Sequence, residues 1–247
     1  MSLFNPQDYY RILSNYWDRL YKDQVPYQQA FEFIDELREK EALPKAVADV
    51  SCGTGLLLQN FEKNGYEIIG SDLSSEMLKH AELKLHRKTL FQGSYHNILL
   101  PKSFPLIVSF FNSFAYCLDP QTLSKVLGHL KSQLMPQGLI VFDLFVTEQP
   151  EEVFLVKSFS FDDGVHISRT FLGYPETNKT FRSHFVFTVF ENRQLQTYAA
   201  ESRRGLFSET DVRKAIEAAE LDIYYVGVGP GHPEHSGSTT FVVQQAK

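Results

Sequence analysis

The strongest constraint on the fold is an apolar run that ends in an acid and turns through small residues into more leucines: V-A-D-V-S-C-G-T-G-L-L-L, residues 47–58. The short run predicts a buried strand over 46–50, and the leucines predict a helix over 56–64 that ends at Gly65. Glycines in such a turn let the backbone approach a ligand, and the first turn of the helix offers free N–H groups. The turn is therefore either an ordinary strand-to-helix connection or one wall of a binding site.

Apolar strands alternate with amphipathic helices along the first 150 residues, and helices are expected over 26–40 and 120–134, for example. The further strands that the pattern predicts are 66–71, 89–92, 106–111, 138–145, 223–228 and 240–244. Strands this apolar are typical of a parallel sheet that helices cover on both faces. The predicted class is α/β, with a doubly wound sheet of seven strands.

The rhythm changes after Pro150. Asp162-Asp163-Gly164 separates two apolar runs, which predicts a β-hairpin, and residues 181–190 then alternate as a strand does. We therefore expect a core made of residues 1–150 and 201–247, with a helical N-terminal segment at 1–40. Residues 151–200 are expected to form an antiparallel β insertion after the fifth strand.

Composition limits the partners. The formal net charge is -6, which argues against a nucleic-acid backbone as partner. Cys52 and Cys117 are the only cysteines, and their spacing suits neither a metal site nor a disulfide framework, so a reducing, cytoplasmic setting and no metal are expected. No apolar stretch is long enough to span a bilayer, and the N-terminus lacks the pattern of a signal peptide.

The acid that ends the second strand narrows the class of ligand. Asp72 follows the first turn by about 20 residues, where a carboxylate can hold ribose hydroxyls. Nicotinamide enzymes and proteins that bind nucleoside methyl donors share this feature. A dinucleotide site needs a third glycine where this chain has Leu58. A buried Asp49 would also repel a pyrophosphate, whereas the ammonium group of an amino-acid-like ligand would satisfy it.

Four segments carry a resemblance to a known family: D-V-S-C-G-T-G (49–55), G-S-D-L-S-S-E-M-L (70–78), Q-G-S-Y (92–95) and V-S-F-F-N-S-F (108–114). In these segments the chain resembles class I S-adenosylmethionine-dependent methyltransferases. Y-W-D-R-L-Y-K-D (16–23) is similar to the N-terminal aromatic segment of their small-molecule branch, which includes glycine-type and aminosugar-type N- or O-methyltransferases. The resemblance covers nearly the whole chain. It implies a Rossmann-like core, S-adenosylmethionine as cofactor, and the insertion as a lid over the acceptor.

The resemblance also implies a role for each matching residue. Asp49 and the turn 51–55 would hold the methionine end of the cofactor, and Asp72 would hold the ribose hydroxyls. The adenine would lie on Leu73 and Met77, and the carbonyl of Phe111 would accept from the methionine ammonium. The full set expected at the cofactor is Asp49, Ser51, Cys52, Gly53, Gly55, Asp72, Leu73, Met77, Gly93, Ser94, Tyr95, Phe111 and Tyr21.

Two positions depart from the family pattern. Ser51 replaces the usual first glycine, which narrows the turn, and Ser94 replaces an acid near the adenine amino group, which loosens the selectivity for adenine.

Methyl transfer from a sulfonium is an in-line displacement on carbon, which needs a base only if the acceptor arrives protonated or as a hydroxyl. His232 and His235, in the loop between the last two strands, are candidate bases, and the alternative is that this loop is a solvated Gly/Pro-rich segment. Asn112, Asp143 and Arg204 are candidate acceptor contacts, and roles as turn residue, helix cap and surface charge stay open for them.

The predicted function is methyl transfer from S-adenosylmethionine to nitrogen or oxygen of a small molecule. Two alternatives remain: a non-catalytic S-adenosylmethionine-binding or regulatory protein, and an NAD(P)-dependent oxidoreductase, which Leu58 and Asp49 disfavour. The 21 Phe and 12 Tyr predict an aromatic acceptor chamber, which would attract an amine by cation–π interaction and would equally suit a flat phenol. Neither a nucleic acid nor a membrane is expected as partner, and the oligomeric state stays open.

Overall fold

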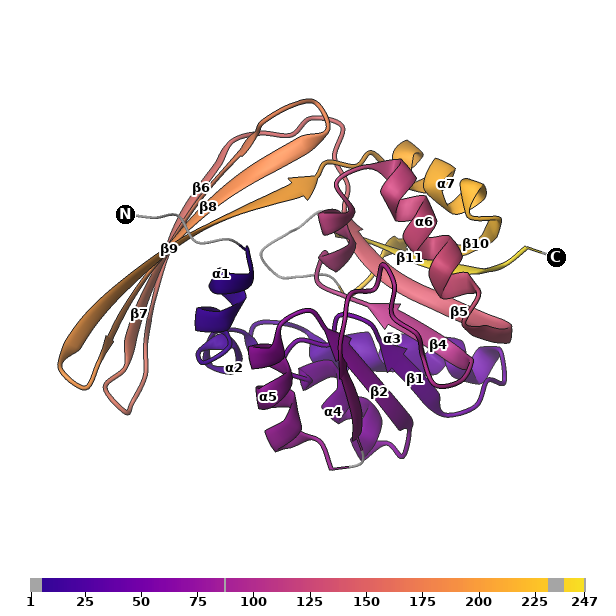
Figure 1. Cartoon of the computed structure of the whole chain (residues 1–247), viewed down its shortest axis with the longest axis horizontal. Helices are drawn as coiled ribbons and strands as arrows, with labels where there is room; N and C mark the ends of the chain where they lie inside the picture. Colours follow the sequence, from indigo (N-terminus) through magenta and orange to yellow (C-terminus); the bar gives the residue numbers. More distant parts are fainter. Residues whose placement is uncertain (1–5, 87, 231–237, 247) are drawn as a thin grey trace.

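The structure is a computed structural model that describes residues 6–86, 88–230 and 238–246. Its centre is a seven-stranded sheet with the order β10-β11-β5-β4-β1-β2-β3 (Figure 1). The strands are β1 (Ala46–Asp49), β2 (Glu67–Asp72), β3 (Lys88–Gln92), β4 (Phe104–Ser109), β5 (Leu134–Phe145), β10 (Leu221–Val228) and β11 (Ser238–Gln245). The predicted α/β class and the seven strands are confirmed.

The sheet is mixed in direction. β1 pairs in parallel with β2 and β4, and β3 and β5 continue the parallel pairing on either side. β11 is antiparallel to both β5 and β10, so the expectation of a parallel sheet was wrong for this strand. The reason is the length of the connection: only residues 229–237 separate β10 from β11, whereas a parallel neighbour needs a crossover of about a dozen residues or more.

Helices cover both faces of the sheet. α3 (Tyr27–Lys40), α4 (Leu56–Lys63) and α5 (Ser75–Lys84) contribute to one buried cluster, and α6 (Pro120–Lys131) and α7 (Glu209–Ala218) contribute to the other. α6 ends three residues earlier than predicted, because Leu134 already begins β5 and pairs with Phe104. Ser208 and Asp211 form a capping box at the start of α7.

The insertion forms a second sheet of four antiparallel strands in sequence order. They are β6 (Val153–Ser160), β7 (His166–Pro175), β8 (Thr180–Glu191) and β9 (Gln194–Gly205). β9 continues five residues beyond the predicted boundary at residue 200. Phe185, Phe187 and Val189 of β8 are buried on one face, as their alternation predicts. The sheet runs along one side of the molecule as a long twisted ribbon (Figure 1).

Two short helices, α1 (Pro6–Leu13) and α2 (Trp17–Tyr21), lie between the core and this second sheet (Figure 1). Arg19 pairs with Asp163 at 2.7 Å, and the hydroxyl of Tyr16 donates to Glu191 at 3.3 Å, so α2 and its flank contact the far ends of two hairpins. Asp18 accepts from the hydroxyl of Thr54 at 2.6 Å, which ties the same helix to the turn after β1. The N-terminal segment therefore connects the insertion to the core. Among the described residues, no helix has the length and apolar character that crossing a membrane would need.

Candidate functional site

A cavity of about 580 Å³ opens where β1, β2 and β4 end at the same edge of the sheet. This is the edge at which open α/β sheets bind ligands. The cavity is lined by eleven of the residues that the sequence assigns to the cofactor: Asp49, Ser51, Cys52, Gly53, Asp72, Leu73, Met77, Gly93, Ser94, Tyr95 and Phe111. Gly55 and Tyr21 do not line it.

The turn after β1 is held by the two carboxylates that border it. The N–H of Ser51 donates to Asp49 at 3.0 Å, and the N–H of Gly53 donates to Asp72 at 2.9 Å. Gly53 and Gly55 have φ of 53° and 81°, in the left-handed region that favours glycine. A Cβ on Gly55 would lie 3.1 Å from the Cβ of Ala81, so this glycine serves the close approach of α4 to α5.

Asp49 is a buried acid with a cavity in front of it. Asp49 is 4% exposed, and among the described residues no cationic side chain pairs with its carboxylate. Burial, with a smaller contribution from the charge of nearby Asp72, raises the pKa of Asp49 to about 7, although the hydrogen bond from the N–H of Ser51 opposes the shift. A cation that reached this carboxylate would restore its charged form. The site therefore fits the ammonium group of S-adenosylmethionine.

Asp72 and the next strand end form the opposite wall. The carboxylate of Asp72 accepts from Gly53 and, at 2.9 Å, from the N–H of Ser74, and burial raises its pKa. Met77 is buried, whereas Leu73 is half exposed at the rim. The hydroxyl of Tyr95 donates to the carbonyl of Ser113 at 3.0 Å, which fixes its ring along the cavity wall. A carboxylate can bind the ribose hydroxyls of a nucleoside, and apolar side chains beside a fixed ring can enclose its base.

The turn after β4 has two consecutive non-glycine residues in the left-handed backbone region, which the sequence did not predict. Phe111 and Asn112 both have positive φ, 64° and 60°. Asp143, which is fully buried, accepts from the N–H of Asn112 at 2.9 Å and from the hydroxyl of Ser238 at 2.8 Å. The side chain of Asn112 in turn accepts from the N–H of Phe145 at 3.0 Å. Asn112 and Asp143 are thus placed behind Phe111, holding its turn, and neither lines the cavity.

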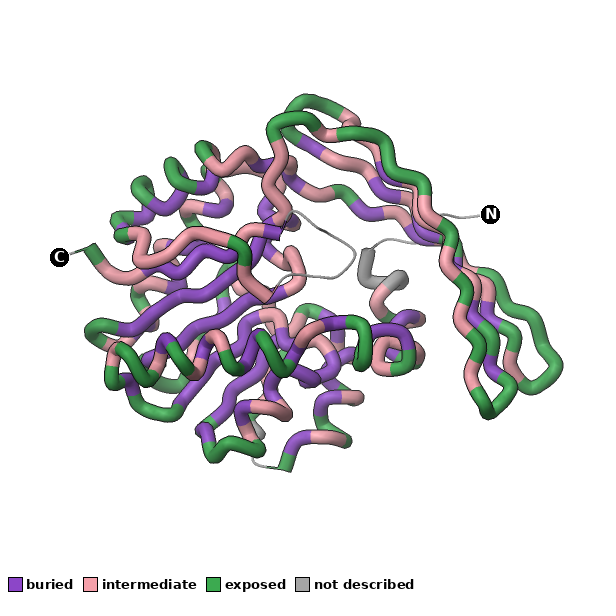
Figure 2. Tube along the Cα trace, turned by 180° about the vertical axis from the view of Figure 1, so that it is seen from behind, coloured by how far each residue is buried: buried purple, intermediate pink, exposed green. Residues whose placement is uncertain are grey.

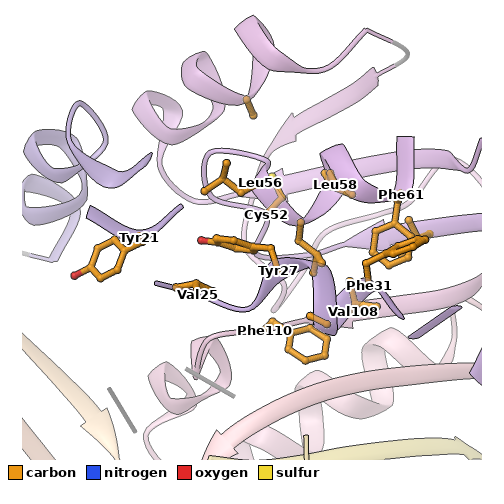
Figure 3. Close-up of a cluster of buried hydrophobic side chains, with 14 of the residues drawn as sticks. Tyr21, Val25, Tyr27, Phe31, Cys52, Leu56, Leu58, Phe61, Val108 and Phe110 are labelled. Carbon is orange, nitrogen blue, oxygen red and sulfur yellow. The ribbon is translucent and has the colours of Figure 1, made fainter. Parts of the chain in front are cut away.

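Aromatic side chains make up the remaining wall. Tyr10, Trp17, Tyr27, Phe110, Phe111 and Tyr116 line the cavity. The indole N–H of Trp17 donates to the hydroxyl of Tyr27 at 3.2 Å, and the hydroxyls of Tyr10 and Tyr116 lie 3.0 Å apart. Figure 3 shows Tyr27 beside Leu56 and Cys52, with its hydroxyl directed toward the side of Tyr21.

Sequence reasoning missed Tyr10, Trp17, Tyr27 and Tyr116 as site residues. A signal for Trp17 was present in the aromatic N-terminal segment, but the contact of Tyr10 with Tyr116 joins residues 106 positions apart.

Two other predicted residues lie one layer further out. Tyr21 is buried behind Trp17, with ring centroids 4.5 Å apart, and its hydroxyl accepts from the guanidinium of Arg169 on β7. The guanidinium of Arg204 on β9 lies 5.5 Å from the ring centre of Tyr116.

The candidate histidines of the last loop, His232 and His235, are outside the described residues. His96 does line the cavity, and burial lowers its pKa.

Comparison with known proteins identifies the family. A family model described as a methyltransferase domain matches residues 47–138. A dTDP-3-amino-3,4,6-trideoxy-alpha-D-glucopyranose N,N-dimethyltransferase of Streptomyces venezuelae is 28% identical over 204 residues, which cover 82% of this chain and 86% of that protein. The chain is a class I S-adenosylmethionine-dependent methyltransferase. Its cofactor is S-adenosylmethionine, and its acceptor is a small molecule.

The fold of this methyltransferase, including the insertion, agrees with solved structures. The crystal structure of Streptomyces venezuelae DesVI superposes with a TM-score of 0.84 at 25% identity, covering 94% of this chain and 98% of that one. The sugar N-methyltransferase KedS8 of Streptoalloteichus has the same fold, with a TM-score of 0.81 at 19% identity over 94% of this chain and 93% of that one. These coverages include the second sheet as well as the core.

Proposed function

We propose that this methyltransferase transfers methyl groups from S-adenosylmethionine to the amino nitrogen of a nucleotide-linked amino sugar. Three curated relatives support the class of acceptor, because each is named as an N,N-dimethyltransferase of a dTDP-amino-sugar, at 28%, 22% and 23% identity. The names of these relatives carry the choice of nitrogen, and the aromatic wall of the cavity is compatible with it. Aromatic faces attract cations, so they favour both the sulfonium donor and the ammonium product of an amine acceptor.

The cofactor is proposed to lie between the two carboxylates. Asp49 and the turn 51–55 would hold the methionine end, with the carbonyl of Phe111 as a further acceptor for its ammonium. Asp72 would bind the ribose hydroxyls, and Leu73, Met77 and the segment Gly93–Tyr95 would enclose the adenine. The fit rests on a buried acid that lacks a cationic partner among the described residues at one end and a second acid with an apolar floor at the other.

The chemical step needs little from the protein beyond alignment. S-adenosylmethionine would supply an activated methyl carbon to the lone pair of the neutral amine, and the carbon–sulfur bond would break with its electrons going to sulfur. The ammonium product would release its proton to water before a second transfer. A hydroxyl acceptor would need a base beside it. Among the described lining residues both carboxylates, Asp49 and Asp72, lie at the proposed cofactor end and not beside the proposed acceptor, which favours an amine; His96 is the one histidine of the lining and would be the candidate base for a hydroxyl.

The acceptor chamber is proposed to be closed by α1, α2 and the inner face of the insertion, with Tyr10, Trp17 and Tyr116 in contact with the acceptor. Arg204 would then position the ring of Tyr116 and not contact the acceptor itself.

We also propose a cytoplasmic location, since Cys52 and Cys117 are both free, buried thiols, which suits a reducing compartment.

The test has two stages. Calorimetry with S-adenosylhomocysteine and with NADH should give binding of the first alone. Turnover is then followed by mass spectrometry on a panel of dTDP-amino-sugars, their deaminated hydroxyl counterparts and simple phenols, and we expect a gain of one or two methyl groups on the amines. Turnover confined to the hydroxyl compounds would overturn the choice of nitrogen, and binding without any turnover would favour the non-catalytic alternative.

A further inference from the structure

The short helix α2 contacts both the insertion and the core. A helix of five residues is not stable on its own, so its contacts with the rest of the chain decide where it lies. Its first residue, Trp17, lines the cavity. Of its two charged residues, Arg19 pairs with Asp163 of the insertion, and Asp18 contacts the core.

The ion pair between α2 and the insertion lies in water. The side chains of Arg19 and Asp163 are 39% and 50% exposed, and an exposed ion pair stabilises little. Asp163 belongs to a hairpin tip, and Figure 2 shows that both far turns of the insertion are exposed. This pair is therefore a weak constraint on the position of α2.

Asp18 is held by the core from two directions. The hydroxyl of Thr54 donates to one oxygen of its carboxylate at 2.6 Å, and the ammonium of Lys84 pairs with the other oxygen. Lys84 also donates to the backbone carbonyl of Thr54 at 2.8 Å, so the three residues close a ring of contacts. Charge-assisted bonds of this kind are shorter and stronger than bonds between neutral groups, so they fix α2 against the core.

This ring of contacts is largely shielded from water. Thr54 is 1% exposed, and the side chain of Lys84, at the end of α5, is 18% exposed. Burial lowers the pKa of Lys84, and the carboxylate of Asp18 opposes that shift. Removing either charged partner therefore leaves the other in a partly buried place without its counter-charge, which is unfavourable.

Asp18 links residues of both ends of the cavity without lining it. Thr54 belongs to the turn 51–55 and lines the cavity there, and Trp17 lines it on the aromatic side. Asp18 is bonded to Thr54 and is the chain neighbour of Trp17. Methyl transfer requires that the attacking atom and the methyl carbon be aligned, and a misplacement of about 1 Å can cost about 100-fold in rate.

We propose that Asp18 is a positioning residue, which fixes Trp17 at a set place relative to the turn 51–55 and so aligns the acceptor nitrogen with the methyl carbon. It acts through Trp17 and contacts neither cofactor nor acceptor. The inference rests on the proposed function, which places the cofactor at the turn 51–55 and the acceptor beside Trp17. An ion pair that only stabilised the fold would change the amount of folded protein and would leave Trp17 in place.

Fluorescence tests the position of Trp17 directly, because Trp17 is the one tryptophan of the chain. Asp18→Ala removes the carboxylate, and Lys84→Met removes the ammonium but keeps a long side chain. In both variants acrylamide should quench Trp17 more strongly than in the parent, because α2 has lost its charged contact with the core. The affinity for S-adenosylhomocysteine, measured by calorimetry, should stay within about threefold of the parent and shows that each variant is folded.

Lys102→Met is the matched control for Lys84→Met. It makes the same change and breaks the pair between Lys102 and Glu67 at 2.7 Å. Glu67 begins β2, whereas the cavity lies at the end of that strand, at Asp72. Quenching of Trp17 should therefore equal that of the parent in this variant.

Turnover of the amine gives the second measurement. Asp18→Ala should lower kcat at least about tenfold, on the scale of a misaligned attack, and should leave the KM for S-adenosylmethionine within about threefold of the parent. Asp18→Asn keeps an oxygen for the hydroxyl of Thr54 and should recover part of the loss.

Unchanged quenching of Trp17 in either folded variant overturns the inference, whatever the acceptor proves to be. A parent-like kcat in a variant whose Trp17 is more accessible also overturns it, as does a large loss of affinity for S-adenosylhomocysteine, which would assign Asp18 to the cofactor site. A parent that binds S-adenosylhomocysteine but methylates no amine overturns the proposed acceptor alone, and the quenching measurement still decides whether Asp18 fixes Trp17.

Discussion

The two ends of the cavity are built on different principles. The proposed cofactor end, called the cofactor end below, is polar and local: Asp49, the turn 51–55 and Asp72 lie at the ends of adjacent parallel strands, and their carboxylates accept from backbone N–H groups of the turn. The proposed acceptor end, called the acceptor end below, is aromatic and assembled from distant segments, since Tyr10 and Trp17 come from the N-terminal helices and Tyr116 from η1 (Ser113–Cys117) after β4. The carboxylates at the strand ends of the core can therefore keep their positions when the N-terminal helices and η1 differ to suit another acceptor.

The difference has an electrostatic side. Burial raises the pKa of both carboxylates at the cofactor end, so the ligand-free site stores an unfavourable charge that a cationic ligand relieves. The acceptor end relies on ring faces and on hydrogen bonds between neutral groups, such as Trp17 to Tyr27 and Tyr10 to Tyr116. Changes at the cofactor end should therefore alter binding of S-adenosylhomocysteine strongly, and changes at the acceptor end should leave it unaltered.

The largest effect is expected from Asp49→Asn. The amide keeps the shape of the carboxylate but removes the charge that meets the ammonium of the ligand. Loss of one partner of a buried charged pair weakens binding by about 2–5 kcal/mol, and calorimetry with S-adenosylhomocysteine measures it. Asp222→Asn changes an exposed acid and is the matched control. An Asn variant that binds as tightly as its parent would remove Asp49 from the cofactor end.

Asp72→Ala should follow, with a loss of about 1.5–3 kcal/mol in binding of S-adenosylhomocysteine, the scale of charge-assisted hydrogen bonds. Asp72 also accepts from Gly53 and Ser74, so Asp72→Asn separates the two roles by keeping one acceptor oxygen for the turn. Part of the loss should be recovered in the Asn variant. Affinities within about twofold of the parent for both variants, far below that scale, would show that ribose is bound elsewhere.

The distance in sequence between the residues of each end explains what could be predicted from the sequence. Asp49 and Asp72 were found because strand ends, glycines and acids lie close together in sequence, and the topology of parallel strands then brings them to one edge. The aromatic wall has no such local pattern, because its N-terminal residues are positioned by contacts between distant segments: Tyr10 meets Tyr116 across 106 positions, and the neighbouring Tyr21 meets Arg169 across 148. Contacts of this kind depend on how the insertion and the N-terminal helices pack, which periodicity does not specify.

Asn112 and Asp143 show a second limit. The sequence placed both near the ends of central strands, where an acceptor contact and a turn residue look alike. Their roles separate only once the backbone is known, because the positive φ of Phe111 and Asn112 needs a buried acceptor to hold it. Gly55 is a similar case, since its need for glycine comes from Ala81 on the next helix, a contact that the turn sequence does not contain.

A pH dependence should appear at the cofactor end. The pKa of Asp49 is raised to about 7 without ligand, well above its value of about 3.9 in an unfolded chain. S-adenosylhomocysteine prefers the charged carboxylate, so its affinity should rise about tenfold from pH 6 to pH 8 and then level off, and Asp49→Asn should flatten the curve. The ligand-free protein should lose stability from about pH 4 to 7, because the folded state binds the extra proton there. A parent affinity that is flat across this range would contradict the proposed ammonium contact.

The smallest effect tests whether the acceptor end acts as a unit. Tyr10→Phe and Tyr116→Phe each remove one hydroxyl of the pair that lies 3.0 Å apart in the cavity wall, while the rings remain. Each should lower kcat/KM for the amine acceptor about fivefold, the scale of one neutral hydrogen bond, and leave the affinity for S-adenosylhomocysteine unchanged. The double variant should be little worse than either single one, because both changes break the same bond. Additive losses would mean that the two hydroxyls contact the acceptor separately, and a loss of cofactor affinity would mean that the two ends of the cavity are not independent.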